Sequence, residues 1–142
     1  MRRLRFVLCL LVLLAPAAQA RECLPEIREG WIRLLPGGMP MHAGFGRIVN
    51  ACRRPAAIVG ARSDAYAEVE LHETRVVEGV SRMRPVPRLA LAARGSAELK
   101  PGGLHLMLMR PASRIEPGQR IVIEFRLADG RRVRGEFVAR SP

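Results

Sequence analysis

Two histidines and two methionines in the middle of the chain have types and spacings that suit a metal centre. Ten residues separate His72 from Met83, twenty-one separate Met83 from His105, and Met107 follows His105 after a single residue. A thioether is a soft, uncharged ligand and an imidazole is borderline. A set of two Met and two His therefore suits copper, above all Cu(I), and suits Mg²⁺, Ca²⁺ or Zn²⁺ poorly. If the four side chains converge, they form a copper site.

The second pair of these candidates lies in a segment that predicts a β-strand. Residues 104–109 alternate without a break between leucine and a His or Met. Successive side chains of a strand point to opposite faces, so His105, Met107 and Met109 are expected on one face and three leucines on the other. A row of leucines indicates a core face. The strand is therefore expected to present the candidate ligands away from the core.

A predicted hairpin positions the first pair. The runs on either side of Glu78-Gly79 have strand-like composition, and a two-residue turn that contains glycine predicts a β-hairpin there. In that register Thr74 faces Met83, and His72 lies diagonal to Met83 on the same face. Diagonal cross-strand neighbours lie roughly 7–8 Å apart, so one ion could bridge them.

The segments HETRVVEGVSRM and LKPGGLHLMLM resemble those of a known family, the periplasmic copper chaperones called PCu(A)C, with their His-x10-Met-x21-His-x-Met motif. The resemblance covers roughly residues 30 to 127 and places His72, Met83, His105 and Met107 at the four ligand positions. It implies an all-β, cupredoxin-like Greek-key β-sandwich that binds one Cu(I). It also implies delivery of that ion toward the copper centre of cytochrome c oxidase.

The rest of the chain predicts short strands separated by frequent turns, which is typical of a β-sandwich or barrel. The segment 63–70 is the one place where a helical turn is expected. Asp129-Gly130 is expected to be the turn of a C-terminal hairpin. The further strand-like runs are 31–35, 44–49, 57–59, 68–72, 121–127 and 132–138.

The first twenty residues are typical of a secretory signal. Arginines open the segment, an apolar run occupies residues 6–14, and Ala-Gln-Ala at 18–20 is a small-residue cleavage site. The apolar run is too short to span a bilayer. We therefore expect a signal peptide at 1–20 and a periplasmic, single copper-binding β-sandwich domain at 21–142, with no transmembrane segment in the mature form.

Two cysteines remain once Cys9 leaves with the signal. An even count in an oxidising compartment predicts a disulfide between Cys23 and Cys52. Ligation of copper by these thiolates is the alternative role, and neither cysteine belongs to a CxxC motif. Arg21-Glu22 before Cys23 is unlike a lipoprotein site, where small residues would be expected.

The chain is strongly basic, with a formal net charge of +11 and a single lysine, Lys100. Loss of the three signal-peptide arginines lowers the charge to +8. A basic surface suits an acidic partner or a membrane surface, but arginine also supplies a solvated outer face, which we favour. Nucleic acid is not an expected partner because the chain is exported and only 4% aromatic.

A third group of soft side chains lies outside the four-residue motif, at Met39, Met41 and His42. Pro40 favours an extended backbone at Met39, which would put Met39 and Met41 on one side and His42 on the other. One interpretation is a loop that leads into the next strand. The other is an auxiliary metal site, in which one of these residues is an entry ligand or a lid beside the main centre.

No catalytic motif accompanies these residues, since the chain has no Gly-rich phosphate loop, no GxSxG and no HExxH. We therefore expect no enzyme but a periplasmic copper chaperone. Its partner would be a copper acceptor, such as a cytochrome c oxidase subunit or another copper chaperone. The alternatives are a copper buffering or resistance protein without a dedicated acceptor, and a metal-free β-sandwich interaction module. An electron-transfer cupredoxin would need a His₂Cys site, which the mature cysteines do not provide.

Overall fold

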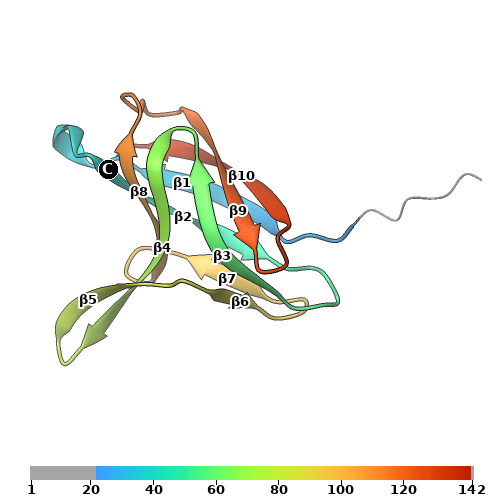
Figure 1. The fold of residues 1–142 in the computed structure, drawn as a ribbon. Helices are drawn as coiled ribbons and strands as arrows, with labels where there is room; N and C mark the ends of the chain where they lie inside the picture. Colours follow the sequence, from blue (N-terminus) through green and yellow to red (C-terminus); the bar gives the residue numbers. More distant parts are fainter. Residues whose placement is uncertain (1–21, 142) are drawn as a thin grey trace, which may run out of the picture.

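A computed structural model describes residues 22–141, which form β-strands joined mostly by short turns (Figure 1). The signal peptide predicted at 1–20 lies outside the described residues. Within residues 22–141, no helix is long and apolar enough to cross a membrane. The elements in chain order are β1 (Glu26–Arg33), η1 (Pro36–Gly38), β2 (Met41–Val49), β3 (Ala56–Ser63), β4 (Tyr66–Val77), β5 (Val80–Pro85), β6 (Leu89–Leu91), β7 (Ser96–Leu99), β8 (Leu104–Pro111), β9 (Arg120–Leu127) and β10 (Arg132–Arg140).

The strands form one sheet that closes on itself. The order of its strands is β5-β4-β8-β2-β1-β10-β9-β3-β6, and β7 pairs with β2 off this path. A further pairing, between β3 and β4, closes the sheet into the wall of a barrel. β1 and β10 run parallel, whereas the other pairs are antiparallel. Strands distant in sequence thus lie side by side, as β8 does between β4 and β2. The prediction of an all-β, cupredoxin-like Greek-key β-sandwich is confirmed.

The core follows from alternation along each strand. In β9 the side chains of Ile121, Ile123, Phe125 and Leu127 are buried, and the residues between them point outward. The same period of two buries Val133 and Phe137 in β10, which pairs with β9 as the predicted C-terminal hairpin. Each CH₂ group buried on the inner faces stabilises the fold by about 0.8 kcal/mol, and this hydrophobic burial keeps the sheet closed.

The predicted helical turn at 63–70 is wrong. β3 continues to Ser63, residues 64 and 65 form a tight turn, and β4 begins at Tyr66. The Ser63 hydroxyl donates to the carbonyl of Val122 at 2.7 Å and accepts from the amide of Ala65 at 3.3 Å, so it satisfies this turn without a helix. Tyr66 and Val69 are buried, and their strand pairs with both β3 and β8.

The predicted disulfide is confirmed, because the structure joins Cys23 to Cys52 with their Cα atoms 5.8 Å apart. The bond ties the segment before β1 to the loop after β2. Fully buried Asn50 organises the same loop: its amide group donates to the carbonyls of Arg54 and Ala92 at 2.9 and 3.0 Å. This end of the barrel is therefore fixed by one covalent bond and by side-chain hydrogen bonds to the backbone.

The hairpin of β4 and β5 extends away from the barrel wall, at the lower left of Figure 1. Thr74 lies opposite Met83, which confirms the predicted register. Glu78 and Gly79 at the tip have φ values of 52° and 77°, which suits the two-residue turns that match strand twist. Every residue of β5 is exposed, so the distal hairpin packs on little of the core.

Candidate metal centre

The centre is built on the outer face of β8. Leu106 and Leu108 are completely buried in the core, whereas Met107 and Met109 are only partly buried on the opposite face. His105 shares that outer face and is nevertheless 6% exposed, because other side chains cover it. The predicted division of this strand into a leucine face and a His/Met face is confirmed.

The two histidines meet across neighbouring strands. His72 in β4 is the direct cross-strand partner of His105 in β8, and their ring centroids lie 6.2 Å apart. Directly paired antiparallel residues have Cβ atoms about 4.5–5.5 Å apart and lie on one face of the sheet. The sequence predicts a shared site for these residues but not this direct pairing.

Hydrogen bonds leave one nitrogen of each ring with a free lone pair. His105 Nδ1 lies 2.9 Å from the carbonyl oxygen of Gly103, so Nδ1 carries the proton and Nε2 is free. His72 Nε2 lies 2.8 Å from a carboxylate oxygen of Glu70, so Nε2 donates there. His72 Nδ1 is buried and has no hydrogen-bond partner. A buried nitrogen without a partner is costly unless something binds it, so these residues fit a metal ion.

Glu70 and Gly103 have the roles that carboxylates and carbonyls take around metal-bound histidines. A histidine ligand generally donates its second N–H to such a group, which fixes the tautomer and orients the ring. Glu70 is two residues before His72 on the same strand, and therefore on the same face. This i, i+2 spacing could have predicted Glu70 as the hydrogen-bond partner of His72, a residue that the sequence analysis did not identify.

A hollow of about 190 Å³ opens beside the histidines. His105, Met83 and Met107 line it, and so do Met41 and Phe45 of β2. His72 is not among its lining residues and reaches the group through its pairing with His105. The hollow therefore brings three of the four candidate ligands to one cavity and places the fourth beside them.

The hollow has a rigid aromatic side and an exposed side. Phe45 is buried, and the Arg33 guanidinium lies over its ring. The centroid of the Phe45 ring is 6.5 Å from that of His105 and 4.6 Å from that of Trp31. Met83 comes from the projecting hairpin and is 55% exposed. The site therefore has firmly packed histidines and one solvent-facing thioether.

The residues of the 39–42 cluster separate in space. Met41 lies on the outer face and lines the hollow, whereas His42 is buried and lies 2.9 Å from the hydroxyl of Tyr66. Burial lowers the pKa of His42, which keeps the ring neutral. Met39 is 46% exposed and lines a different hollow with η1. Met41 and His42 thus both border the hollow of the candidate centre, but the His42 ring is buried against Tyr66, and Met39 lies elsewhere.

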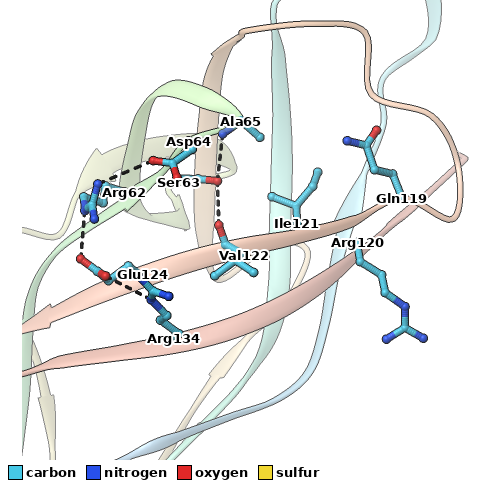
Figure 2. A pocket seen from close by; sticks show the side chains of 10 residues that line it. All are labelled: Arg62, Ser63, Asp64, Ala65, Gln119, Arg120, Ile121, Val122, Glu124 and Arg134. Atoms are coloured by element: carbon cyan, nitrogen blue, oxygen red, sulfur yellow. Dashed lines mark hydrogen bonds and ion pairs between the residues drawn. The ribbon is translucent and has the colours of Figure 1, made fainter.

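Another hollow, over β3, β9 and β10, has a different chemistry. These strands lie across the barrel from β8 in the order of the wall. Figure 2 shows Glu124 between Arg62 and Arg134, and its carboxylate bonds to both guanidinium groups, at 2.9 and 3.3 Å. The hydrogen bond from Arg62, followed by that from Arg134, keeps the pKa of Glu124 below its ordinary value. This cluster is an ion-pair network with no sulfur or imidazole.

Solved PCuAC domains have the same fold. The copper-bound PCuAC domain from PmoF2 is 18% identical, with a TM-score of 0.67, and the match covers 83% of this chain and 93% of that domain. Apo-DR1885 and CuI-DR1885 from Deinococcus radiodurans are each 24% identical, with TM-scores of 0.65 and 0.64. Those matches cover 100% and 89% of this chain and 97% and 83% of DR1885. At these identities the likeness establishes the fold.

Sequence similarity identifies the family. The relative Lxx21020 of Leifsonia xyli subsp. xyli (strain CTCB07), whose name describes it as a candidate lipoprotein, is 33% identical over 106 residues. The match covers 74% of this chain, which spans 63% of the length of that relative. The LpqE-like family, also described as candidate lipoproteins, matches residues 26–139. The chain belongs to the LpqE-like family, and its fold is that of the PCuAC domains.

Proposed function

We propose that this protein binds one Cu(I) ion through His72, Met83, His105 and Met107 and transfers it to an acceptor protein. The observation that carries the proposal is the pair of free imidazole lone pairs, at His72 Nδ1 and His105 Nε2, on directly paired residues. The hollow beside them supplies two thioethers. Two borderline and two soft neutral donors suit Cu(I).

The construction of the site suits delivery better than permanent storage. The histidines are held by β4 and β8 and by their hydrogen bonds, whereas Met83 comes from an exposed hairpin. An incoming donor can displace the exposed thioether first while the histidines still hold the ion. Stepwise exchange avoids release of the free ion, so a partly open site is what a chaperone needs.

The acceptor is a protein with its own soft copper ligands. The resemblance to PCu(A)C implies a cytochrome c oxidase component or another copper chaperone in that role. The test is a transfer assay between the Cu(I)-loaded protein and a purified oxidase copper-binding domain, monitored by size-exclusion chromatography with metal analysis. Copper that stays on this protein despite a tighter-binding acceptor would favour the buffering alternative.

We place the protein outside the cytoplasm, in the periplasm, after cleavage before Arg21. The Cys23–Cys52 disulfide supports an oxidising compartment. A lipid thioether on Cys23 and this disulfide exclude each other, because each uses the single Sγ of that residue. Intact mass of the exported protein distinguishes them: a chain that starts at Arg21 with two hydrogens fewer supports the proposal, and a lipidated Cys23 refutes it.

The copper site is tested by anaerobic Cu(I) titration against a competing chelator, with X-ray absorption to count sulfur and nitrogen ligands. We expect one tight ion bound by two sulfurs and two nitrogens. Met107→Leu retains volume and removes only the sulfur, so folding should change by less than about 1.5 kcal/mol. Its Cu(I) affinity should fall at least about tenfold, equivalent to about 1.4 kcal/mol.

Met39→Leu is the matched control, because Met39 lines a different hollow. Its Cu(I) affinity should equal that of the parent. Fluorescence of Trp31, the chain's only tryptophan, gives an independent signal because Trp31 packs against Phe45 beside the site. Parental affinity in both Met107→Leu and His105→Ala would refute the assigned ligands.

A further inference from the structure

The methionines of this protein avoid the core. Five of the six lie in the described residues, at Met39, Met41, Met83, Met107 and Met109, and none is among the buried core side chains. Methionine is normally an adaptable core filler, so the placement of four of these residues on or beside the outer face of β8 needs another explanation. The proposed copper centre uses Met83 and Met107. Met41 and Met109 remain unexplained.

Strand register places these two residues next to the proposed centre. Met41 in β2 is the direct cross-strand partner of Met109 in β8, and Ala43 is the partner of Met107. Met41 and Met109 therefore lie on one face with Cβ atoms roughly 4.5–5.5 Å apart, and Met107 is the diagonal neighbour of Met41, roughly 7–8 Å away. Met41 and Met107 also line the same hollow.

The side chains at this place can converge on one ion. Met41, Met107 and Met109 are each partly buried, so none is enclosed in the core and none is fully exposed. Each has three rotatable bonds, and the small Ala43 opposite Met107 leaves room above the sheet. Three thioethers form a neutral, soft donor set that has no proton to lose and favours Cu(I).

The charges beside this methionine cluster largely balance. Glu68 and Glu70 of β4 pair with Met109 and Met107 from the other side of β8. Arg110 bonds to the carboxylate of Glu68 at 2.6 Å, and Glu70 bonds to His72. Arg33 also lines the hollow, where its guanidinium lies over the Phe45 ring and forms no ion pair within the described residues. Its positive charge offsets the negative charge of Glu70, so the charges do not attract a cation and binding depends on the sulfur donors.

We infer that Met41, Met107 and Met109 form a second, weaker Cu(I) site, from which the ion passes to the histidine site. The transfer step, unlike the second site itself, rests on the proposed function. In it, the dative bonds from Met41 and Met109 break as bonds to His105, His72 and Met83 form, and Met107 stays bound throughout. The ion remains Cu(I), so no electron or proton has to move.

The test is anaerobic Cu(I) titration of the protein with ¹³C-labelled methionine methyl groups, followed by NMR. The first equivalent should shift the Met83 and Met107 signals. The second should shift Met41 and Met109, which hold it as a pair because Met107 is already bound to the first ion, and Met39 should stay unmoved as an internal control. Methyl signals of Met41 and Met109 that do not move through two equivalents overturn the second site.

Two variants separate this site from the proposed centre. In His72→Ala/His105→Ala, the first Cu(I) should now shift Met41 and Met109 and give an X-ray absorption spectrum with sulfur ligands and no imidazole. In Met41→Leu/Met109→Leu, the second equivalent should be lost while the first keeps its affinity, and loading of the histidine site should slow.

The outcomes are distinguishable. If the first equivalent leaves Met83 and Met107 unmoved, the proposed centre fails whatever Met41 and Met109 do. If the first equivalent behaves as expected but the Met41→Leu/Met109→Leu variant still binds a second ion, the methionine site alone is overturned. Equal loading rates in this variant and the parent would overturn the transfer step and leave the chaperone centre intact.

Discussion

Removal of the disulfide by Cys23→Ser/Cys52→Ser should lower the free energy of unfolding by a calculable amount. The bond spans a sequence separation of 29 residues. In the chain-entropy model, closing a loop of that length removes about 12 cal/mol/K from the unfolded state, or roughly 3.6 kcal/mol at 25 °C. Cys23 is exposed and Cys52 only partly buried, so little packing is lost, and the effect should come from loop closure.

The folded state itself should survive the change. Arg131 holds the segment before β1 independently of the sulfur, through bonds of 3.1 Å to the Cys23 carbonyl and to the Glu22 carboxylate. Loss of roughly 3.6 kcal/mol corresponds to a decrease in Tm of roughly 10–18 °C for a domain of this size.

The assay is urea unfolding monitored by Trp31 fluorescence, with the reduced parent as a second route to the same state. The midpoint should fall equally in the Ser/Ser variant and in the parent with reductant, and both should have native circular dichroism in water. A loss below about 1 kcal/mol would contradict the reasoning, because it would mean that the unfolded chain gains little freedom when the loop opens.

Three further changes test other parts of the fold. Asn50→Ala should cost about 1–3 kcal/mol in urea unfolding, because it deletes two hydrogen bonds from a fully buried side chain to backbone carbonyls, and an unchanged midpoint would contradict this role. Gly135→Ala should destabilise by about 1–3 kcal/mol, because its new Cβ would lie 2.6 Å from Ile27; an unchanged Tm would count against that contact. Burial raises the pKa of Tyr66, the only tyrosine, to about 12, so phenolate absorbance should appear near pH 12. Since the unfolded tyrosine ionises near 10, stability should fall as pH rises from about 10 through 12, and a native-state transition near 10 would disprove this burial effect.

Much of the fold could be predicted from local pattern. Alternation in residues 121–127 and 104–109, together with turn chemistry at Glu78-Gly79, gives the strands β8 and β9 and the register of β4 with β5. The sequence did not predict β6 and β7, which are only three and four residues long. Such short strands carry too little alternation to be recognised, and they exist because β3 and β2 offer them free edges.

The predicted helical turn at 63–70 failed for a related reason. Polar and small residues there permit a helical turn locally, but the segment pairs with β3 and β8 on its two sides, and Tyr66 and Val69 are buried in that arrangement. Tertiary burial outweighed local preference, which is a weak determinant. The order of the strands around the barrel, and therefore the placement of β8 between β4 and β2, depends on long-range packing that no single segment reveals.

For the candidate site, the alternation of side chains along a strand predicts which residues share a face, but not which strands become neighbours. The alternation of side chains along β8 is enough to predict that His105, Met107 and Met109 share one face. The neighbour relations then decide the chemistry: β4 places His72 directly opposite His105, and β2 places Met41 opposite Met109. A shift of one residue in either register would move that partner to the leucine face. The soft-ligand surface is thus a consequence of two registers, each fixed by the buried leucines behind it, and Leu106 and Leu108 position the proposed copper ligands as firmly as they fill the core.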